Sequence, residues 1–172
     1  MSKPDIQDRT LQAEALETGN AAIEEEKYLS FRLGEETYGV AVARIREIIQ
    51  HQPITSVPQM PFHVRGVLNL RGKVIPVVDM RLKFALGDGS VTERTCIIVV
   101  QYDCPERGQI LAGLIVDAVD EVRSIPSTEI EERPALGTSV DNECILGLTK
   151  IEDEVITLLN IERILTEETL QV

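Results

Sequence analysis

The side chains that most often bind metals or carry redox chemistry are few in this chain and poorly spaced for either task. The two histidines, His51 and His63, lack the i, i+4 spacing of a helical metal-binding pair, and no His-Glu-x-x-His motif occurs. The three cysteines show no Cys-x-x-Cys spacing and cannot all pair with one another. We therefore interpret the histidines as polar loop residues and Cys96 as a core residue, and we expect no bound metal.

Motifs for nucleotide binding and for catalysis are also missing from the sequence. It has neither a Gly-x-Gly-x-x-Gly motif nor a phosphate-binding loop that ends in Gly-Lys-Ser/Thr. Carboxylates occur throughout the chain, so no pair of them stands out as a general acid and base. We expect a protein that is not an enzyme and that needs no cofactor.

The chain is acidic overall but basic in one segment. Its 172 residues include 29 acidic and 17 basic side chains, for a formal net charge of −12. This excess argues against binding to nucleic acid or to an anionic membrane surface. Residues 63–83 are the exception, with five basic residues against the single acid Asp79; the five are Arg65, Arg71, Lys73, Arg81 and Lys83. For Arg81 and Lys83 we favour solvated surface positions.

Arg71 lies in a tight turn, Arg71-Gly72-Lys73, between two short apolar strands. A related turn later in the chain reads Glu152-Asp153-Glu154, so the hairpin itself does not require a cation. Two interpretations remain for Arg71: a solvated turn residue, or a guanidinium that binds a carboxylate or carbonyls of a partner.

An internal repeat underlies that comparison. Residues 66–70 and 74–80 align without gaps on residues 81 positions later, and residues 39–42 and 45–48 align on residues 74 positions later. Each copy runs strand, turn, strand, cap and short helix, with Asp79 and Asn160 at the helix N-caps. Glycines recur at matching positions, which favours a true repeat over chance similarity of aliphatic strands. We expect structural roles in turns, close approaches and caps for Gly39, Gly72, Asp79, Gly113, Gly147 and Asn160.

The pattern predicts an all-β fold made of two similar small barrels. We place an acidic flexible tail over residues 1–27, the first barrel over 28–86, a linker over 87–93, and the second barrel with a C-terminal helix over 94–172. The longest apolar run, 110–116, is far too short to cross a bilayer and fits a buried strand. Without a signal-like N-terminus or paired cysteines, we expect the cytoplasm as the location. Barrels of this size hold no internal ligand, so function means surface binding.

Several stretches together resemble the CheW-like adaptor family of bacterial chemotaxis. They are residues 28–39, 45–48 and 113–117, the Gly-Leu pair at 147–148, residues 159–161 and, most specifically, the Arg-Gly-Val-Leu-Asn-Leu-Arg-Gly stretch with its downstream Ile-Pro-Val-Val-Asp over residues 65–81. The resemblance covers about residues 28–166. It implies two SH3-like five-stranded barrels and no catalytic activity.

The resemblance also implies partners. Members of that family connect the cytoplasmic tips of chemoreceptors (methyl-accepting chemotaxis proteins) to the regulatory domain of a chemotaxis histidine kinase. We accordingly expect a protein that is monomeric when alone and that joins arrays at the inner membrane face through the receptors, without inserting into the membrane. Carried over by position, the receptor-binding residues are Ile45, Glu47, Arg65, Gly66, Asn69, Leu70, Arg71 and Ile97.

Two other classes of function stay open from the residues alone. A small barrel that binds oligonucleotides or oligosaccharides would use an exposed strand face, but only three phenylalanines and three tyrosines are available for stacking. A small hydrolase would need a pocket with His51, His63 or perturbed carboxylates. Both alternatives find less support in the sequence than an adaptor does.

Overall fold

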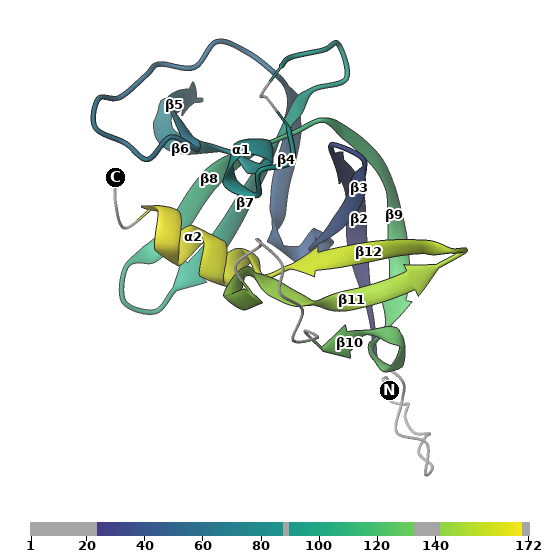
Figure 1. Ribbon diagram of the computed structural model, residues 1–172. Helices are drawn as coiled ribbons and strands as arrows, with labels where there is room; N and C mark the ends of the chain where they lie inside the picture. The colour runs from purple at the N-terminus through teal and green to yellow at the C-terminus, as the bar shows by residue number, and fades with distance from the viewer. Residues whose placement is uncertain (1–23, 88–89, 133–141, 170–172) are drawn as a thin grey trace.

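The computed structural model describes residues 24–87, 90–132 and 142–169 (Figure 1). The acidic tail expected over residues 1–27 lies mostly outside these residues. Its end needs a correction, because strand β2 (Glu25–Leu33) already begins at Glu25. Burial along this strand starts at Tyr28. The alternating pattern therefore located the buried part of the strand and missed its exposed start.

The described residues form two β-sheets, and the all-β class is confirmed. In spatial order, sheet 1 contains β10 (Glu131–Glu132), β11 (Ile145–Ile151), β12 (Glu154–Leu159), β3 (Glu36–Ala41), β2 and β9 (Ala118–Pro126). Sheet 2 contains β4 (Ile45–Gln50), β7 (Cys96–Cys104), β8 (Gly108–Val116), β6 (Lys73–Asp79) and β5 (Val64–Leu70). The helical elements are η2 (Val42–Arg44), α1 (Met80–Lys83), η3 (Ser127–Glu129), η4 (Asn142–Cys144) and α2 (Ile161–Thr169).

The two sheets do not follow the predicted division into residues 28–86 and 94–172. The β2–β3 hairpin belongs to sheet 1, between β9 and β12, whereas the β7–β8 hairpin belongs to sheet 2, between β4 and β6. Parallel pairing joins β3 to β12 and β6 to β8. We call residues 24–87 half 1 and residues 90–169 half 2. Each half thus gives its first hairpin to one sheet and its later strands to the other.

Short crossovers explain this exchange. In half 1 the three residues of η2 connect β3 in sheet 1 to β4 in sheet 2, and in half 2 Asp117 alone connects β8 in sheet 2 to β9 in sheet 1. A comparison of the sequence with itself detects equivalent strands but contains no information on which copies pair. The repeat was therefore visible in the sequence, while the exchange of hairpins was not.

The core is mostly aliphatic and has three parts, and the rings of Phe31, Tyr38 and Phe84 stack in the largest of them. One cluster fills the interior of sheet 2 and a second fills that of sheet 1. The largest cluster lies between the sheets and combines residues of both with Ile161, Ile164 and Leu165 of α2. Helix α2 covers β7 and β8 (Figure 1), so it packs on strands of its own half within sheet 2.

Gly66 in β5 is required by a close approach of the backbone. Its φ is +144°, and a Cβ built there would lie 1.9 Å from the carbonyl oxygen of Thr55. The loop after β4 passes at this point, where Thr55 and Val67 exchange two backbone hydrogen bonds of 2.8 and 3.0 Å. Gly147, at the matching position of half 2, would clash in the same way with the carbonyl oxygen of Glu131 at 2.5 Å. At both positions the backbone of another segment leaves no room for a side chain, which explains why glycine recurs in the two halves.

We expect Gly66→Ala to lower the free energy of unfolding by more than about 2 kcal/mol, because the new methyl group displaces the Thr55 segment and the residue has an unfavourable φ. The matched control is Gly72→Ala. Gly72 also has a positive φ, of 85°, but its Cβ would meet nothing within 4 Å, so the cost is limited to about 1–2 kcal/mol of backbone strain. Urea unfolding of both variants measures the difference, and equal losses would contradict the role of Thr55.

Candidate partner-binding site

The β5–β6 turn and its counterpart between β11 and β12 share a backbone conformation but differ in side chains. Arg71 and Gly72 have φ values of 50° and 85°, and the matching Glu152 and Asp153 have values of 49° and 70°. Both are therefore two-residue turns with positive φ at both central positions, which suit the twist of a hairpin. In the first turn the Gly72 amide donates to Asn69 Oδ1 at 2.8 Å. Asn69, expected to contact a receptor, thus holds the turn.

Arg71 binds a carboxylate of its own chain. Its guanidinium donates to both carboxylate oxygens of Glu47, with an Nη2 to Oε1 distance of 2.8 Å and a second bond from Nη1 to Oε2. Glu47 lies in β4 and Arg71 follows β5, and these are the two outermost strands of sheet 2. The ion pair therefore joins the two edges of this sheet.

The pair also fixes the charge and the orientation of Arg71. The hydrogen bond from Arg71 holds the pKa of Glu47 below its usual value, and the same bond raises the pKa of Arg71. Both groups stay charged at neutral pH. The Arg71 side chain is 71% exposed while that of Glu47 is only 22% exposed. The guanidinium is thus presented to solvent in a set orientation, with Glu47 behind it.

The apolar residues expected at this site are half-buried, and two neighbours are more exposed. Ile45 packs against the central cluster and Leu70 against the interior of sheet 2. Ile48 and Val74 are 45% and 62% exposed. Our sequence analysis missed both, although strict alternation in β4 puts Ile48 on the outward face. Val74 lies opposite Asn69 in the β5–β6 pairing.

Ile97 does not lie on the surface, contrary to our expectation. Its side chain is fully buried in the interior of sheet 2, because β7 is a central strand between β4 and β8. A Cβ at Gly113 would come within 2.8 Å of the Ile97 side chain, so Ile97 packs where that glycine leaves room. Gly39 plays the same part in sheet 1, where a Cβ would lie 2.8 Å from Leu158. Gly66, in turn, is covered by Thr55 of the same chain.

Arg65 and Arg81 converge on the buried carboxylate of Asp79. Asp79 Oδ1 accepts the Arg81 amide and Nε, each at 3.0 Å, and Oδ2 accepts Arg81 Nη2 at 2.9 Å and Arg65 Nε at 3.2 Å. The side chain of Arg81 is only 2% exposed. Our interpretation of Arg81 as a solvated residue was wrong, because a chelating carboxylate two residues away permits burial of the cation.

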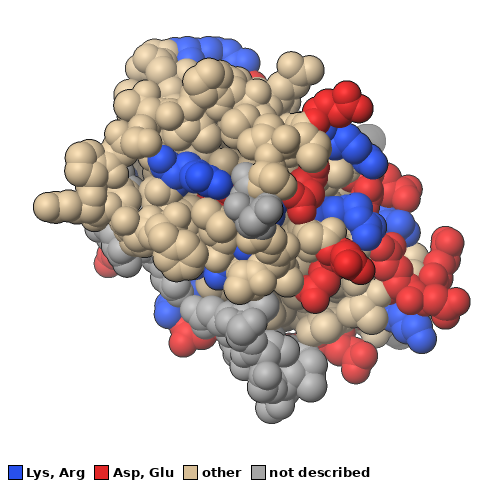
Figure 2. All heavy atoms as spheres, turned by 45° about the horizontal axis from the view of Figure 1, so that its top comes forward, with Lys and Arg blue, Asp and Glu red and all other residues tan. Residues whose placement is uncertain are grey.

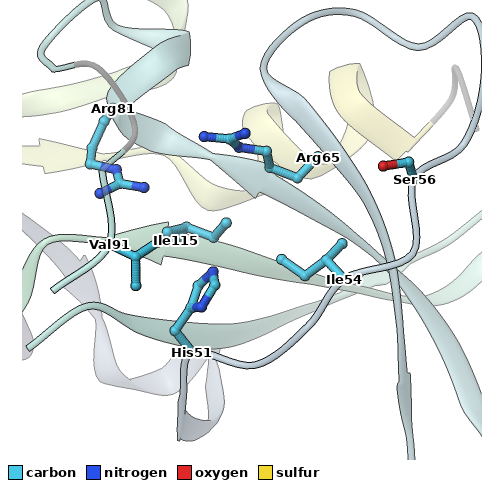
Figure 3. Close-up of a pocket in the computed structure, with 7 residues that line it drawn as sticks. All are labelled: His51, Ile54, Ser56, Arg65, Arg81, Val91 and Ile115. Atoms are coloured by element: carbon cyan, nitrogen blue, oxygen red, sulfur yellow. The ribbon is translucent and has the colours of Figure 1, made fainter. Parts of the chain in front are cut away.

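The charges of this cluster balance. Burial opposes ionisation of Asp79, but hydrogen bonds from Arg81 and Arg65 outweigh it and lower the pKa of Asp79. Arg81 Nη1 also donates to Asp117 Oδ1 at 3.0 Å. Arg65 and Arg81 line a pocket of about 250 Å³ (Figure 3) together with His51, Ile54, Ser56, Val91 and Ile115. Its two cations face Asp79 and Asp117 of the same chain.

Ion pairs within the chain involve three of the five basic residues in segment 63–83, so this segment is not a patch of unpaired positive charge. Arg65 and Arg81 contact Asp79, and Arg71 contacts Glu47. In Figure 2, acidic and basic side chains lie close together at one end of the molecule, and much of the remaining face carries neither. The site is therefore defined by the orientation of Arg71 and the exposed Ile48 and Val74 rather than by an excess of positive charge.

This fold and this site define a protein that acts by binding: duplicated small barrels present an oriented ion pair and apolar side chains on the outside. Among the described residues no group of His, Cys, Asp and Glu could hold a metal ion, and no helix is long and apolar enough to cross a membrane.

Comparison with known proteins gives the family. A family model described as a CheW-like domain matches residues 27–169, so the chain belongs to the CheW-like family. The chemotaxis protein CheW of Klebsiella aerogenes is 32% identical over 143 residues, which cover 83% of each chain. Protein FrzA of Myxococcus xanthus is 30% identical over 143 residues, covering 82% of this chain and 86% of its own.

A solved structure agrees with this assignment. The crystal structure of the scaffolding protein TtCheW from Thermoanaerobacter tengcongensis matches with a TM-score of 0.72 at 34% identity, over 82% of this chain and 88% of that one. Proteins of this family are scaffolds and not enzymes, which confirms our expectation that the chain has no catalytic activity.

We expect Asp79→Ala to lower the free energy of unfolding by about 3–5 kcal/mol, because it leaves the buried Arg81 with half of its carboxylate partners. The matched control is Asn160→Ala. Asn160 occupies the same cap in half 2, where its Oδ1 accepts the Arg163 amide at 3.1 Å and no buried cation depends on it. That loss should be about 1 kcal/mol. Urea unfolding measures both, and similar losses would contradict the importance of the buried cluster.

The lowered pKa of Asp79 predicts a pH dependence of stability. In the unfolded chain this carboxyl has a pKa near about 3.9, and in the folded protein its pKa is lower. Its stabilising contribution is therefore complete above about pH 4 and is lost as the pH falls through the folded-state value. We expect Asp79→Asn to flatten the decline of unfolding free energy below about pH 4, whereas Asn160→Ala keeps the wild-type slope. Identical slopes for wild type and Asp79→Asn would refute this assignment.

Proposed function

We propose that this chain couples the cytoplasmic tips of chemoreceptors to a chemotaxis histidine kinase, so that the state of the receptor controls the kinase. Membership of the CheW-like family makes the chain a chemotaxis scaffold. The finer assignment is supported by the site in sheet 2, which offers an oriented cation beside apolar side chains. We accordingly propose that the protein works in the cytoplasm, at the inner membrane face where receptors gather.

The observation that carries the receptor assignment is the bidentate pair between Glu47 and Arg71. Glu47 holds the guanidinium at a fixed place, so Arg71 gives up little side-chain freedom when a partner binds it. Ile48 follows Glu47 in β4 and points to the other face of that strand, and Val74 lies in β6, just after the turn that carries Arg71. These two exposed side chains are the ones that we propose contact the apolar stripe of an amphipathic helix. A carboxylate or carbonyl on that helix would bind Arg71 and set the register.

The matching surface of sheet 1 differs in charge. Val122 and Val155 occupy the positions of Ile48 and Val74, and each is 53% exposed. Glu121 and Glu152 occupy those of Glu47 and Arg71, so two acids replace the ion pair, and Glu121 pairs with Arg123 at 3.0 Å. The receptor site is thus particular to sheet 2. We assign the kinase contact to an apolar surface elsewhere on the barrels, because a coupling protein must hold both partners at once.

The experiment compares reversal of charge at the two equivalent turns. Calorimetry measures the affinity of a soluble fragment that contains a chemoreceptor tip for wild type, Arg71→Glu and the control Glu152→Arg. We expect Arg71→Glu to weaken binding about tenfold or more, because it removes the donor and sets two acids side by side, and Glu152→Arg to bind as wild type does.

A double variant separates recognition from folding. Glu47→Arg combined with Arg71→Glu restores an ion pair between β4 and the turn but presents the opposite charge to the partner. We expect its unfolding midpoint to return to the wild-type value while receptor binding stays weak. Equal receptor affinity for wild type and Arg71→Glu would refute the proposed receptor site.

A further inference from the structure

The two crossovers between the sheets are each held by an ion pair that joins the two halves. At the first, Asp117 of half 2 binds Arg81 of helix α1 in half 1, with Nη1 and Oδ1 3.0 Å apart. Asp117 Oδ2 also accepts the amide of Gly34 at 2.6 Å, and the Asp117 amide donates to the Arg32 carbonyl at 3.0 Å. We call Arg81–Asp117 the first crossover pair. It fixes the point where the chain passes from β8 to β9.

The second crossover has a corresponding pair. Arg44, the last residue of η2 in half 1, binds Glu162 of helix α2 in half 2, with Nη2 and Oε2 2.6 Å apart. Its guanidinium also lies 5.5 Å from the ring centroid of Tyr102, again in half 2. We call Arg44–Glu162 the second crossover pair. It holds the point where the chain passes from β3 to β4.

The two pairs occupy equivalent places with opposite polarity. Arg81 and Glu162 are exactly one repeat offset, 81 residues, apart, and Arg44 aligns with Ala118, the residue next to Asp117. In each pair a helix of one half contacts the crossover of the other half. The helix supplies the cation in the first pair and the anion in the second. Nothing in the duplicated backbone requires this reversal.

The reversal matters because the halves are similar enough to pair wrongly. If half 1 of one chain paired with half 1 of a second copy, Arg81 would face Arg44. If half 2 paired with half 2, Glu162 would face Asp117. Only the pairing of half 1 with half 2 brings opposite charges together at both crossovers, and like charges at close range disfavour the alternatives.

We propose that the two crossover pairs specify which halves associate, and that they exclude an exchanged dimer in which like halves of two copies of this chain pair. Exchange of equivalent elements between protomers is a low-cost route to dimers, so a duplicated and interlaced chain needs such a determinant. The second crossover pair is exposed, at 37% and 43%, and an exposed pair adds little stability. The second crossover pair instead acts on specificity: its charges attract when half 1 pairs with half 2, and they meet like charges when two like halves pair.

The decisive variant combines Arg44→Glu with Glu162→Arg. Within one chain it restores an opposite pair at the second crossover, so the urea midpoint should equal that of wild type. Between copies it removes both repulsions, because the introduced glutamate attracts Arg81 and the introduced arginine attracts Asp117. We expect the full-length double variant, refolded at high protein concentration, to give a dimer fraction several-fold above that of wild type and to lose this excess in high salt.

The measurement is light scattering after chromatography, with energy transfer between two separately labelled batches that are refolded together. The matched control reverses the pair Glu143–Arg163, which also involves α2 but lies wholly within half 2 and cannot discriminate between partners. We expect the control to keep the wild-type dimer fraction. A double variant with the wild-type dimer fraction and midpoint would overturn the proposal, since the crossover pairs would then be dispensable for the choice of partner half.

Discussion

Neither half of this chain contains a complete sheet, and the rest of the structure depends on this exchange of hairpins. In sheet 2 the outer strands β4 and β5 come from half 1, while β7 and β8 of half 2 lie between β4 and β6. Glu47 and Arg71 both belong to half 1, yet the strands that position them are joined through half 2. The central cluster takes residues from both sheets and from α2, so the packing of the core also depends on both halves. The candidate binding site is therefore a property of the assembled pair of halves.

The two halves have kept their backbone geometry and changed their charges. Both turns have positive φ at both central residues, and a chain segment passes both Gly66 and Gly147. These features are fixed by steric contacts that allow little variation. Charges at equivalent surface positions are not constrained in this way, so Arg71 in one turn is matched by Glu152 in the other. This division suits the proposed function, because one backbone plan then offers two different surfaces for the two proposed partners.

Local signals in the sequence predicted the local features. Period-two alternation, the apolar run that became β8 and the capping residues of α1 and α2 all act over a few residues, and each was readable. Pairings between residues far apart in the chain could not be predicted from the sequence. The contact of Arg71 with Glu47, 24 residues away, depends on which strands form the edges of sheet 2. The burial of Ile97 has the same origin, since only the sheet order makes β7 a central strand. Arg81 illustrates another limit, because its burial depends on the distant Asp117 as well as on the neighbouring Asp79.

Ion pairs within the chain limit the range over which its cations can attract a partner. The five cations of residues 63–83 would attract an acidic partner from a distance if they stood alone, but three of them contact carboxylates of the same chain. With an overall charge of −12, the field of the molecule offers such a partner no long-range attraction. Discrimination would then arise on contact, where an oriented guanidinium donates only to a well-placed acceptor and the exposed Ile48 and Val74 require a matching apolar stripe. We therefore propose that fixed geometry, rather than net charge, is the basis on which this scaffold selects its partners.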